Sequence, residues 1–213
     1  VFFLIALAGV PLLFSILITT VGIIWAQDLG HPLETIFLSF IGGVEPFILL
    51  AVPLFIFAGE LLAQGGVGKR IVEFARVLFG WLPGGLGVVT VMSCTMFGGV
   101  SGSAIADTAA IGSLVIPAMI ARGYSRGFAA ALLAVAGTIA LLMPLSIPFL
   151  IYAFISGVSM RTLSMAGLLP ALASAIALIV VCMWHGRKTG CDNGEDRSTM
   201  PQIWAATRDA GPA

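Results

Sequence analysis

The sequence carries very little charge for its length. Only 9% of its 213 residues are charged and 59% are hydrophobic, whereas about 25% of the residues of a soluble domain are charged. Such a composition cannot supply the polar surface that water requires, so we expect an integral membrane protein embedded in the lipid bilayer. The ten basic residues balance the ten acidic ones and form no basic patch with aromatic residues, which excludes nucleic acid as an expected partner.

Residues for metal or catalytic chemistry are equally scarce. The two histidines and three cysteines show no metal-ligand spacing. Cys94 and Cys182 lie in apolar runs, where a cysteine is typically a small buried residue. The sequence contains no acid pair and no nucleophile–base pair that would indicate an enzymatic reaction. We therefore expect neither an enzyme nor a resident metal cofactor.

Long apolar runs predict an all-α membrane fold. A helix needs about 20 apolar residues to cross a bilayer, and three segments approach or exceed this length: Phe2–Ala26, Pro46–Gln64 and Leu163–Trp184. The run Gly9-Val10-Pro11 predicts a kink in the first of them.

Two shorter segments are amphipathic. Pro32–Ile41 and Val67–Leu78 repeat apolar residues at helical spacing on one face, and the second carries basic residues on the other. Gly42-Gly43 predicts the end of the first segment. We expect both to be arms that lie at the membrane surface.

The segment Leu86–Ala121 is broken by glycine and serine. Its first part, Leu86–Phe97, would span only about 18 Å as a helix, against a hydrocarbon core of about 30 Å. The run Gly98–Ser103 interrupts the helix, and Ala104–Ala121 resumes it. Two structures fit this pattern: one kinked span, or a re-entrant hairpin that turns back at Gly98–Ser103.

The distribution of basic residues favours the hairpin, because cytoplasmic loops are rich in Lys and Arg. A hairpin keeps the residues before and after Leu86–Ala121 on one side of the membrane. Only Arg161 then lies outside. The other nine basic residues lie in the cytoplasm: Lys69, Arg70, Arg76, Arg122, Arg126, Arg187, Lys188, Arg197 and Arg208.

The break is a candidate binding site, because irregular backbone at membrane depth is tolerated only inside protein or beside a water-filled cavity. The first half-helix, ending near Phe97, exposes carbonyls that suit Na⁺. The second, beginning near Ser103, exposes N–H groups that suit a carboxylate. The alternative is that small residues only allow close helix packing. The candidate residues are Gly98, Gly99, Ser101, Gly102 and Ser103.

Asp107 joins this candidate site. It lies one helical turn after Ser103, and an acid within a membrane segment is rare and usually functional. The alternative is that Asp107 hydrogen-bonds local backbone and only holds the loop.

A second break lies at Pro144–Pro148, within the apolar stretch Phe128–Gly157. Because proline lacks an N–H, the carbonyls of Ala140 and Pro144 are expected to lose their helical partners. Gly137, Thr138 and Ser146 lie beside these carbonyls. Together these groups indicate an oxygen-lined cation site against the hairpin tip. A plain proline kink is the alternative.

Two runs, Val52–Leu61 (VPLFIFAGEL) and Met96–Asp107 (MFGGVSGSAIAD), resemble the large permease subunit of tripartite ATP-independent periplasmic (TRAP) transporters. The resemblance continues through Ile116–Met119, Gly123-Tyr124 and Gly127–Leu132. It implies an elevator-type symporter of the bacterial inner membrane that imports organic anions such as C4-dicarboxylates or sialic acid with Na⁺ as coupling ion. It also implies two partners, a small four-helix membrane subunit and a periplasmic substrate-binding protein.

The chain departs from the family pattern in two respects. The family usually has a Gly-Pro pair and a double proline at the second break, where this chain has Ala140-Leu141 and Pro144-Leu145, so an altered cation site is expected. Permeases of this family also have a second, inverted half, so we expect this chain to be the N-terminal half. The alternative is a non-transporting truncated product or a structural membrane assembly partner.

The expected organisation has six parts. They are scaffold transmembrane helices with an interfacial arm at 1–64, a cytoplasmic amphipathic arm at 65–85, a re-entrant hairpin at 86–121, a broken transmembrane helix at 122–160, a further transmembrane helix at 161–186, and a cytoplasmic connector at 187–213 that ends before a second repeat.

Overall fold

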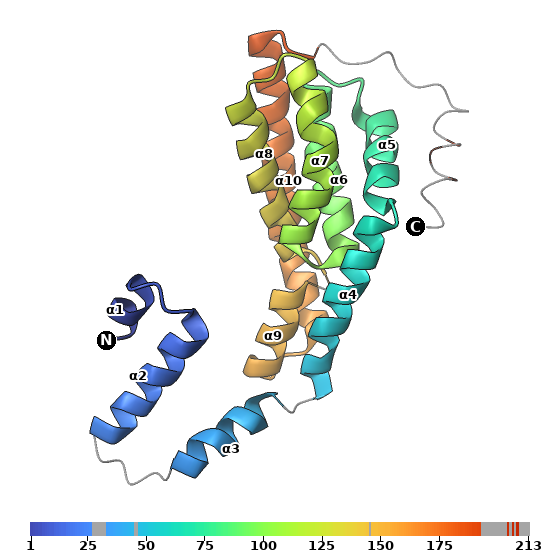
Figure 1. Cartoon of the computed structure of the whole chain (residues 1–213). Helices are drawn as coiled ribbons and strands as arrows, with labels where there is room; N and C mark the ends of the chain where they lie inside the picture. The colour runs from blue at the N-terminus through green and yellow to red at the C-terminus, as the bar shows by residue number, and fades with distance from the viewer. Residues whose placement is uncertain are drawn as a thin grey trace. The chain divides into compact units, whose positions relative to one another are not determined.

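The computed structural model describes residues 1–26, 33–44, 47–144 and 146–192, together with the single residues 204, 206 and 208. Within these ranges, helices and their connections make up the whole structure (Figure 1). This confirms the predicted all-α fold. The chain divides into two compact units, Val1–Phe47 and Ile48–Ala213.

The first unit contains α1 (Phe2–Leu7), α2 (Leu12–Ala26) and α3 (Leu33–Val44). The predicted kink at Gly9–Pro11 is a full break between α1 and α2, because Gly9 takes a left-handed φ of 87° and Pro11 has no N–H to donate. The segment Phe2–Ala26 is therefore two helices rather than one kinked helix. The predicted stop at Gly42-Gly43 is also wrong, since α3 continues through both glycines to Val44.

The second unit begins with α4 (Ala51–Gln64), which follows the 3₁₀ turn η1 (Phe47–Leu50). A bend of 65° separates α4 from α5 (Val67–Phe79), and Gly66 makes it with a left-handed φ of 76°. The amphipathic prediction for α5 is confirmed. Val67, Ile71 and Ala75 are buried. The charged residues of α5 are exposed: Lys69, Arg70, Glu73 and Arg76.

A helical hairpin forms the centre of the second unit. It consists of α6 (Gly85–Ser101) and α7 (Ala104–Ala121), which run in opposite directions with their open ends at the same end of the unit (Figure 1). The chain reverses at Gly102, whose φ of 64° is left-handed. The kinked single span is therefore excluded. That the hairpin is re-entrant stays a prediction.

The expected end of the first half-helix near Phe97 is wrong, because α6 continues to Ser101. Gly98 and Gly99 keep right-handed helical angles, and only Gly102 leaves them. Glycine lowers helix propensity by about 1 kcal/mol, but α6 is held by packing against α5, α7, α8 and α10. Burial of this helix thus outweighs its local preference. Its length is about 25 Å rather than 18 Å.

The remaining helices are α8 (Arg126–Ile139), the 3₁₀ turn η2 (Ala140–Leu142), α9 (Ile147–Ser156) and α10 (Met160–Thr189). The break between α8 and α9 falls in the predicted proline region. Ser159 caps the beginning of α10 by accepting a hydrogen bond from the Thr162 N–H at 3.2 Å. Gly190, with a left-handed φ of 65°, ends it.

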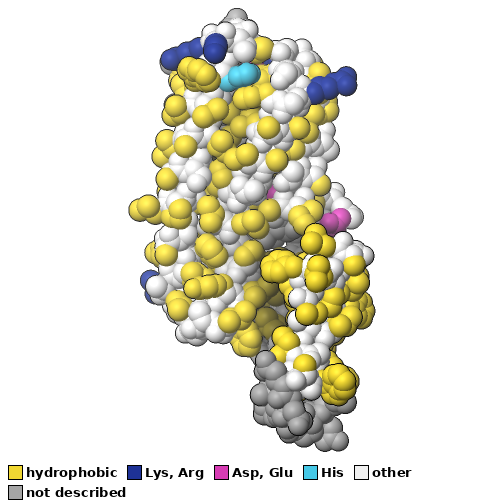
Figure 2. All heavy atoms as spheres, turned by 90° about the vertical axis from the view of Figure 1, so that its left-hand side faces the viewer, with side chains coloured by type: hydrophobic (Ala, Val, Ile, Leu, Met, Phe, Trp, Pro, Cys, Tyr) yellow, Lys and Arg dark blue, Asp and Glu magenta, His cyan; other side chains and the backbone are white. Residues whose placement is uncertain are grey.

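The surface of the second unit suits lipid. Among the described residues, three segments are long and apolar enough to cross a membrane: Ala104–Ala121, Arg126–Ser156 and Met160–Thr189. A fourth is counted if the bent pair α4–α5 forms one span. Ile155 and Leu169 are each 77% exposed. Figure 2 shows hydrophobic side chains along the sides of the helices, with Lys and Arg mainly at one end. The predicted integral membrane protein is confirmed.

Candidate functional site

The hairpin tip is a short turn ordered by two serines. The Ser101 hydroxyl accepts a hydrogen bond from the Ser103 N–H at 3.2 Å. Ser103 is the N-cap of α7, and its hydroxyl accepts from the Ala106 N–H at 3.4 Å. Ser103 therefore caps the beginning of α7. The N-terminus of α7, with its partial positive charge, opens at this turn.

Asp107 is fully buried behind the tip. One carboxylate oxygen, Oδ1, accepts a hydrogen bond from the Ser101 hydroxyl. The other, Oδ2, is buried without a hydrogen-bond partner. An unpaired buried carboxylate oxygen is costly unless something compensates it. Asp107 thus has one oxygen that holds the tip and one that is available to a cation or a proton donor.

Two neighbouring elements pack closely against the tip. A Cβ built on Gly98 would lie 3.1 Å from Asp107 Oδ2 and would collide with Ala140 of η2. From the other side, a Cβ on Gly59 of α4 would lie 3.2 Å from the Ser101 carbonyl oxygen. Asp107 therefore lies in a site formed by α4, α6, α7 and η2, where Gly98 leaves no room for a larger side chain and Gly59 allows a close approach to the Ser101 backbone.

Gly59 is a site residue that the sequence did not identify. The sequence did contain a signal for Gly59, because a glycine inside an apolar helix often marks a place where another backbone comes close. What the sequence lacked was the partner, since Ser101 lies far along the chain.

The second break contacts the tip through the backbone. The Ile147 N–H donates to the Gly102 carbonyl at 3.4 Å. Ser146, the preceding residue, is fully buried, and its hydroxyl has no hydrogen-bond partner. The expectation that the Ala140 carbonyl loses its partner is wrong, because it accepts from the Met143 N–H at 3.3 Å. The 3₁₀ turn η2 supplies the donor that the proline removes.

Other candidate residues lie away from this site. Thr138 is exposed, and its hydroxyl donates to the Val135 carbonyl of its own helix at 2.7 Å. It lines an open groove of about 440 Å³ between α7 and α8, beside Thr108 and Gly137. Gly99 has open space around it, with nothing within 4 Å of a built Cβ. Pro144 is half-buried in the turn after η2.

The structure thus brings together Gly98, Ser101, Gly102, Ser103 and Asp107, with Ser146 next to the residue that contacts Gly102. Within the described part of the chain, no group of three or more His, Cys, Asp or Glu side chains could hold a metal ion. A buried polar cluster at the turn of a helical hairpin, packed among apolar helices, is typical of an α-helical integral membrane protein.

Comparison with known proteins gives the family. The family described as "Tripartite ATP-independent periplasmic transporter, DctM component" matches residues 1–213. The chain belongs to this family, and the predicted resemblance is confirmed. It is a protein of the bacterial inner membrane.

Several curated relatives are similar over most of the chain. The 2,3-diketo-L-gulonate TRAP transporter large permease protein YiaN of Escherichia coli (strain K12) is 35% identical over 196 residues, which are 92% of this chain and 46% of that protein. The C4-dicarboxylate TRAP transporter large permease protein DctM of Vibrio cholerae is 38% identical, over 82% of this chain and 38% of that protein. The sialic acid TRAP transporter large permease protein SiaM of Vibrio cholerae is 37% identical, over 87% and 41%. The matched region spans less than half of each relative.

Proposed function

We propose that this chain is part of the permease subunit of a Na⁺-coupled TRAP-type secondary transporter that imports organic anions. The names of its relatives support this class, because C4-dicarboxylates and sialic acid are both carboxylates. The chain corresponds to the first half of such a permease. Its partners are the small four-helix membrane subunit and a periplasmic substrate-binding protein.

The buried Asp107 is the observation that carries the proposal. Its free oxygen, Oδ2, and the carbonyls at the end of α6 are hard oxygen ligands of the kind that Na⁺ accepts. The beginning of α7, just across the turn, suits the carboxylate of a substrate.

The same geometry supports coupling of anion binding to Na⁺ binding. The charge of Asp107 repels an anion placed at the turn, because two like charges in a low-dielectric site interact strongly. A cation bound at Asp107 removes this repulsion. Substrate therefore binds well only after Na⁺ has bound.

The proposal includes the re-entrant character of the hairpin and an elevator-type movement. Its open end carries positive charge, which supports entry from the cytoplasmic side. Arg122 follows α7, Arg126 begins α8, and Arg187 and Lys188 lie in the last turn of α10. Arg161 lies at the opposite end of α10, about 39 Å away along the helix axis.

Uptake measurements on the complete permease with its partners test this function. In proteoliposomes, Asp107→Asn is expected to raise the half-saturating Na⁺ concentration by about tenfold or more, because a charged ligand is lost. Glu60→Gln is the matched control, since Glu60 is exposed on α4. Unchanged Na⁺ dependence in Asp107→Asn would remove Asp107 from the ion site. Absence of uptake by the unmodified protein at any Na⁺ concentration would favour the non-transporting alternative.

A further inference from the structure

A second buried carboxylate lies at the opposite end of the hairpin from Asp107. Asp192 follows the end of α10, and its side chain is only 2% exposed. Its φ of 54° is left-handed, and no other non-glycine residue in the described ranges has a positive φ. Such a conformation is uncommon for residues other than glycine, and aspartate and asparagine tolerate it best. A buried charge on a left-handed residue indicates that the surrounding contacts determine its position.

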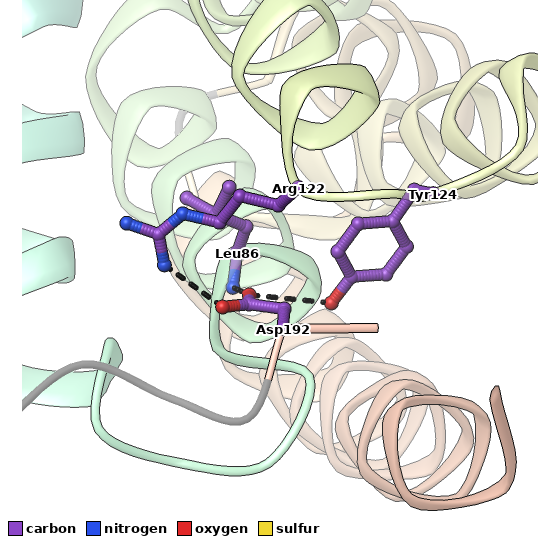
Figure 3. Close-up of polar contacts among 4 residues, drawn as sticks. All are labelled: Leu86, Arg122, Tyr124 and Asp192. Carbon is purple, nitrogen blue, oxygen red and sulfur yellow. Dashed lines mark hydrogen bonds and ion pairs between the residues drawn. The ribbon is translucent and has the colours of Figure 1, made fainter. Parts of the chain in front are cut away.

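Those contacts come from three different elements (Figure 3). At the beginning of α6, the Leu86 N–H donates to Asp192 Oδ2 at 2.7 Å. At the end of α7, Arg122 Nη1 lies 2.8 Å from Asp192 Oδ1 as an ion pair. In the turn before α8, the Tyr124 hydroxyl donates to Oδ2 at 3.4 Å. One carboxylate therefore joins both open ends of the hairpin.

The electrostatics of this cluster are favourable at both helix ends. A negative charge at the beginning of α6 and the Arg122 cation just after the end of α7 each oppose the local helix dipole. Burial, together with the negative charge of Asp192, raises the pKa of the Tyr124 hydroxyl above its usual range. Tyr124 therefore stays a neutral donor to the carboxylate.

Backbone packing holds α10 to the same place. The Gly84 N–H donates to the Asp192 carbonyl at 3.0 Å. A Cβ on Gly186 of α10 would lie 2.5 Å from the Gly84 nitrogen and 2.6 Å from its Cα. The two backbones thus touch, and α10 cannot shift along α6 without breaking these contacts.

We propose that Asp192 is a positioning residue for the site at the hairpin tip. Its carboxylate fixes the separation and register of α6 and α7 at their open end and ties both to α10. Because α6 is one continuous and largely buried helix, this register is carried about 22 Å along the helix from Leu86 to Ser101. The placement of Ser101 against Asp107 thus depends on Asp192. The functional meaning of this role rests on the proposed function, whereas its structural part does not.

Hydrogen exchange on the complete protein in nanodiscs tests the proposal. Asp192→Asn keeps the shape and the tolerance of a left-handed φ but removes the charge. Asp192→Gly keeps the backbone conformation and removes the carboxylate. Exchange is followed in peptides covering the base, residues 84–92, and the tip, residues 98–107. Glu73→Gln is the control, because Glu73 is an exposed carboxylate paired with Arg76 at 3.8 Å, and such pairs contribute little.

Both Asp192 variants are expected to exchange about tenfold faster at the base and at the tip, while the control stays unchanged. Faster exchange confined to the base means that Asp192 is only a local cap, which overturns the proposal, as does no change at all. If the Asp192 variants fail to fold, Arg122→Gln serves instead, with the same two outcomes.

Comparing KCl with NaCl separates this proposal from the proposed function. The role of Asp192 is tested by comparing hydrogen exchange of the Asp192 variants with that of the unmodified protein in KCl alone. If Na⁺ binds at the tip, NaCl slows tip exchange in the unmodified protein. Absence of that slowing counts against the proposed function and leaves the result for Asp192 intact.

Discussion

At the scale of single residues, the candidate site depends on two glycines, which allow close packing, and on the carboxylate of Asp107. Gly98 and Gly59 let η2 and α4 approach the tip to backbone contact. Ser101 occupies one oxygen of Asp107, and the other stays free of hydrogen bonds. The shape of the site thus comes from glycines, and its chemistry from Asp107.

The neighbouring glycines Gly98 and Gly99 provide a matched test of this packing. Gly98→Ala is expected to destabilise the protein by about 1–3 kcal/mol, because its methyl group collides with Ala140. Gly99→Ala meets open space and is expected to be neutral or to stabilise by up to about 1 kcal/mol through helix propensity. Thermal unfolding in detergent measures both. Equal melting temperatures for the two variants would contradict the close contact between α6 and η2.

At the scale of helices, the sequence predicted most elements because apolar periodicity and chain breakers are local signals. The limits of α7 and the amphipathic face of α5 follow from the pattern alone. The end of α6 could not be predicted from the pattern, because tertiary packing keeps Gly98 and Gly99 helical against their propensity. The carbonyl of Ala140 was likewise misjudged, since a 3₁₀ turn supplied the donor that an α-helix would lack.

Cysteine labelling with a membrane-impermeant thiol reagent tests how the hairpin lies in the membrane. In a background without native cysteines, Lys69→Cys and Arg126→Cys are expected to react from the cytoplasmic side and Arg161→Cys from the outside. Ile105→Cys, at the tip, is 86% exposed in this structure, and a re-entrant hairpin keeps it from the outer solution. Labelling of Ile105→Cys from outside as fast as Arg161→Cys would show that the hairpin crosses the membrane.

At the scale of the second unit, one hairpin connects two buried carboxylates, with Asp107 at its tip and Asp192 at its base. Neither set of contacts was readable from the sequence. The Leu86 contact with Asp192 joins residues 106 positions apart, and Gly59 reaches Ser101 from a different helix. Local patterns identify Asp107 as unusual, but only the fold shows which elements hold it and how its two oxygens differ.

Equilibrium binding of ²²Na⁺ to the purified complete permease is the most direct test of Na⁺ binding at the tip through Asp107, because it does not require transport. The unmodified protein is expected to bind Na⁺ saturably in the absence of substrate. Asp107→Asn is expected to bind it about tenfold or more weakly, and Glu60→Gln to bind it normally. Equal Na⁺ affinity in the unmodified protein and Asp107→Asn would contradict the claim.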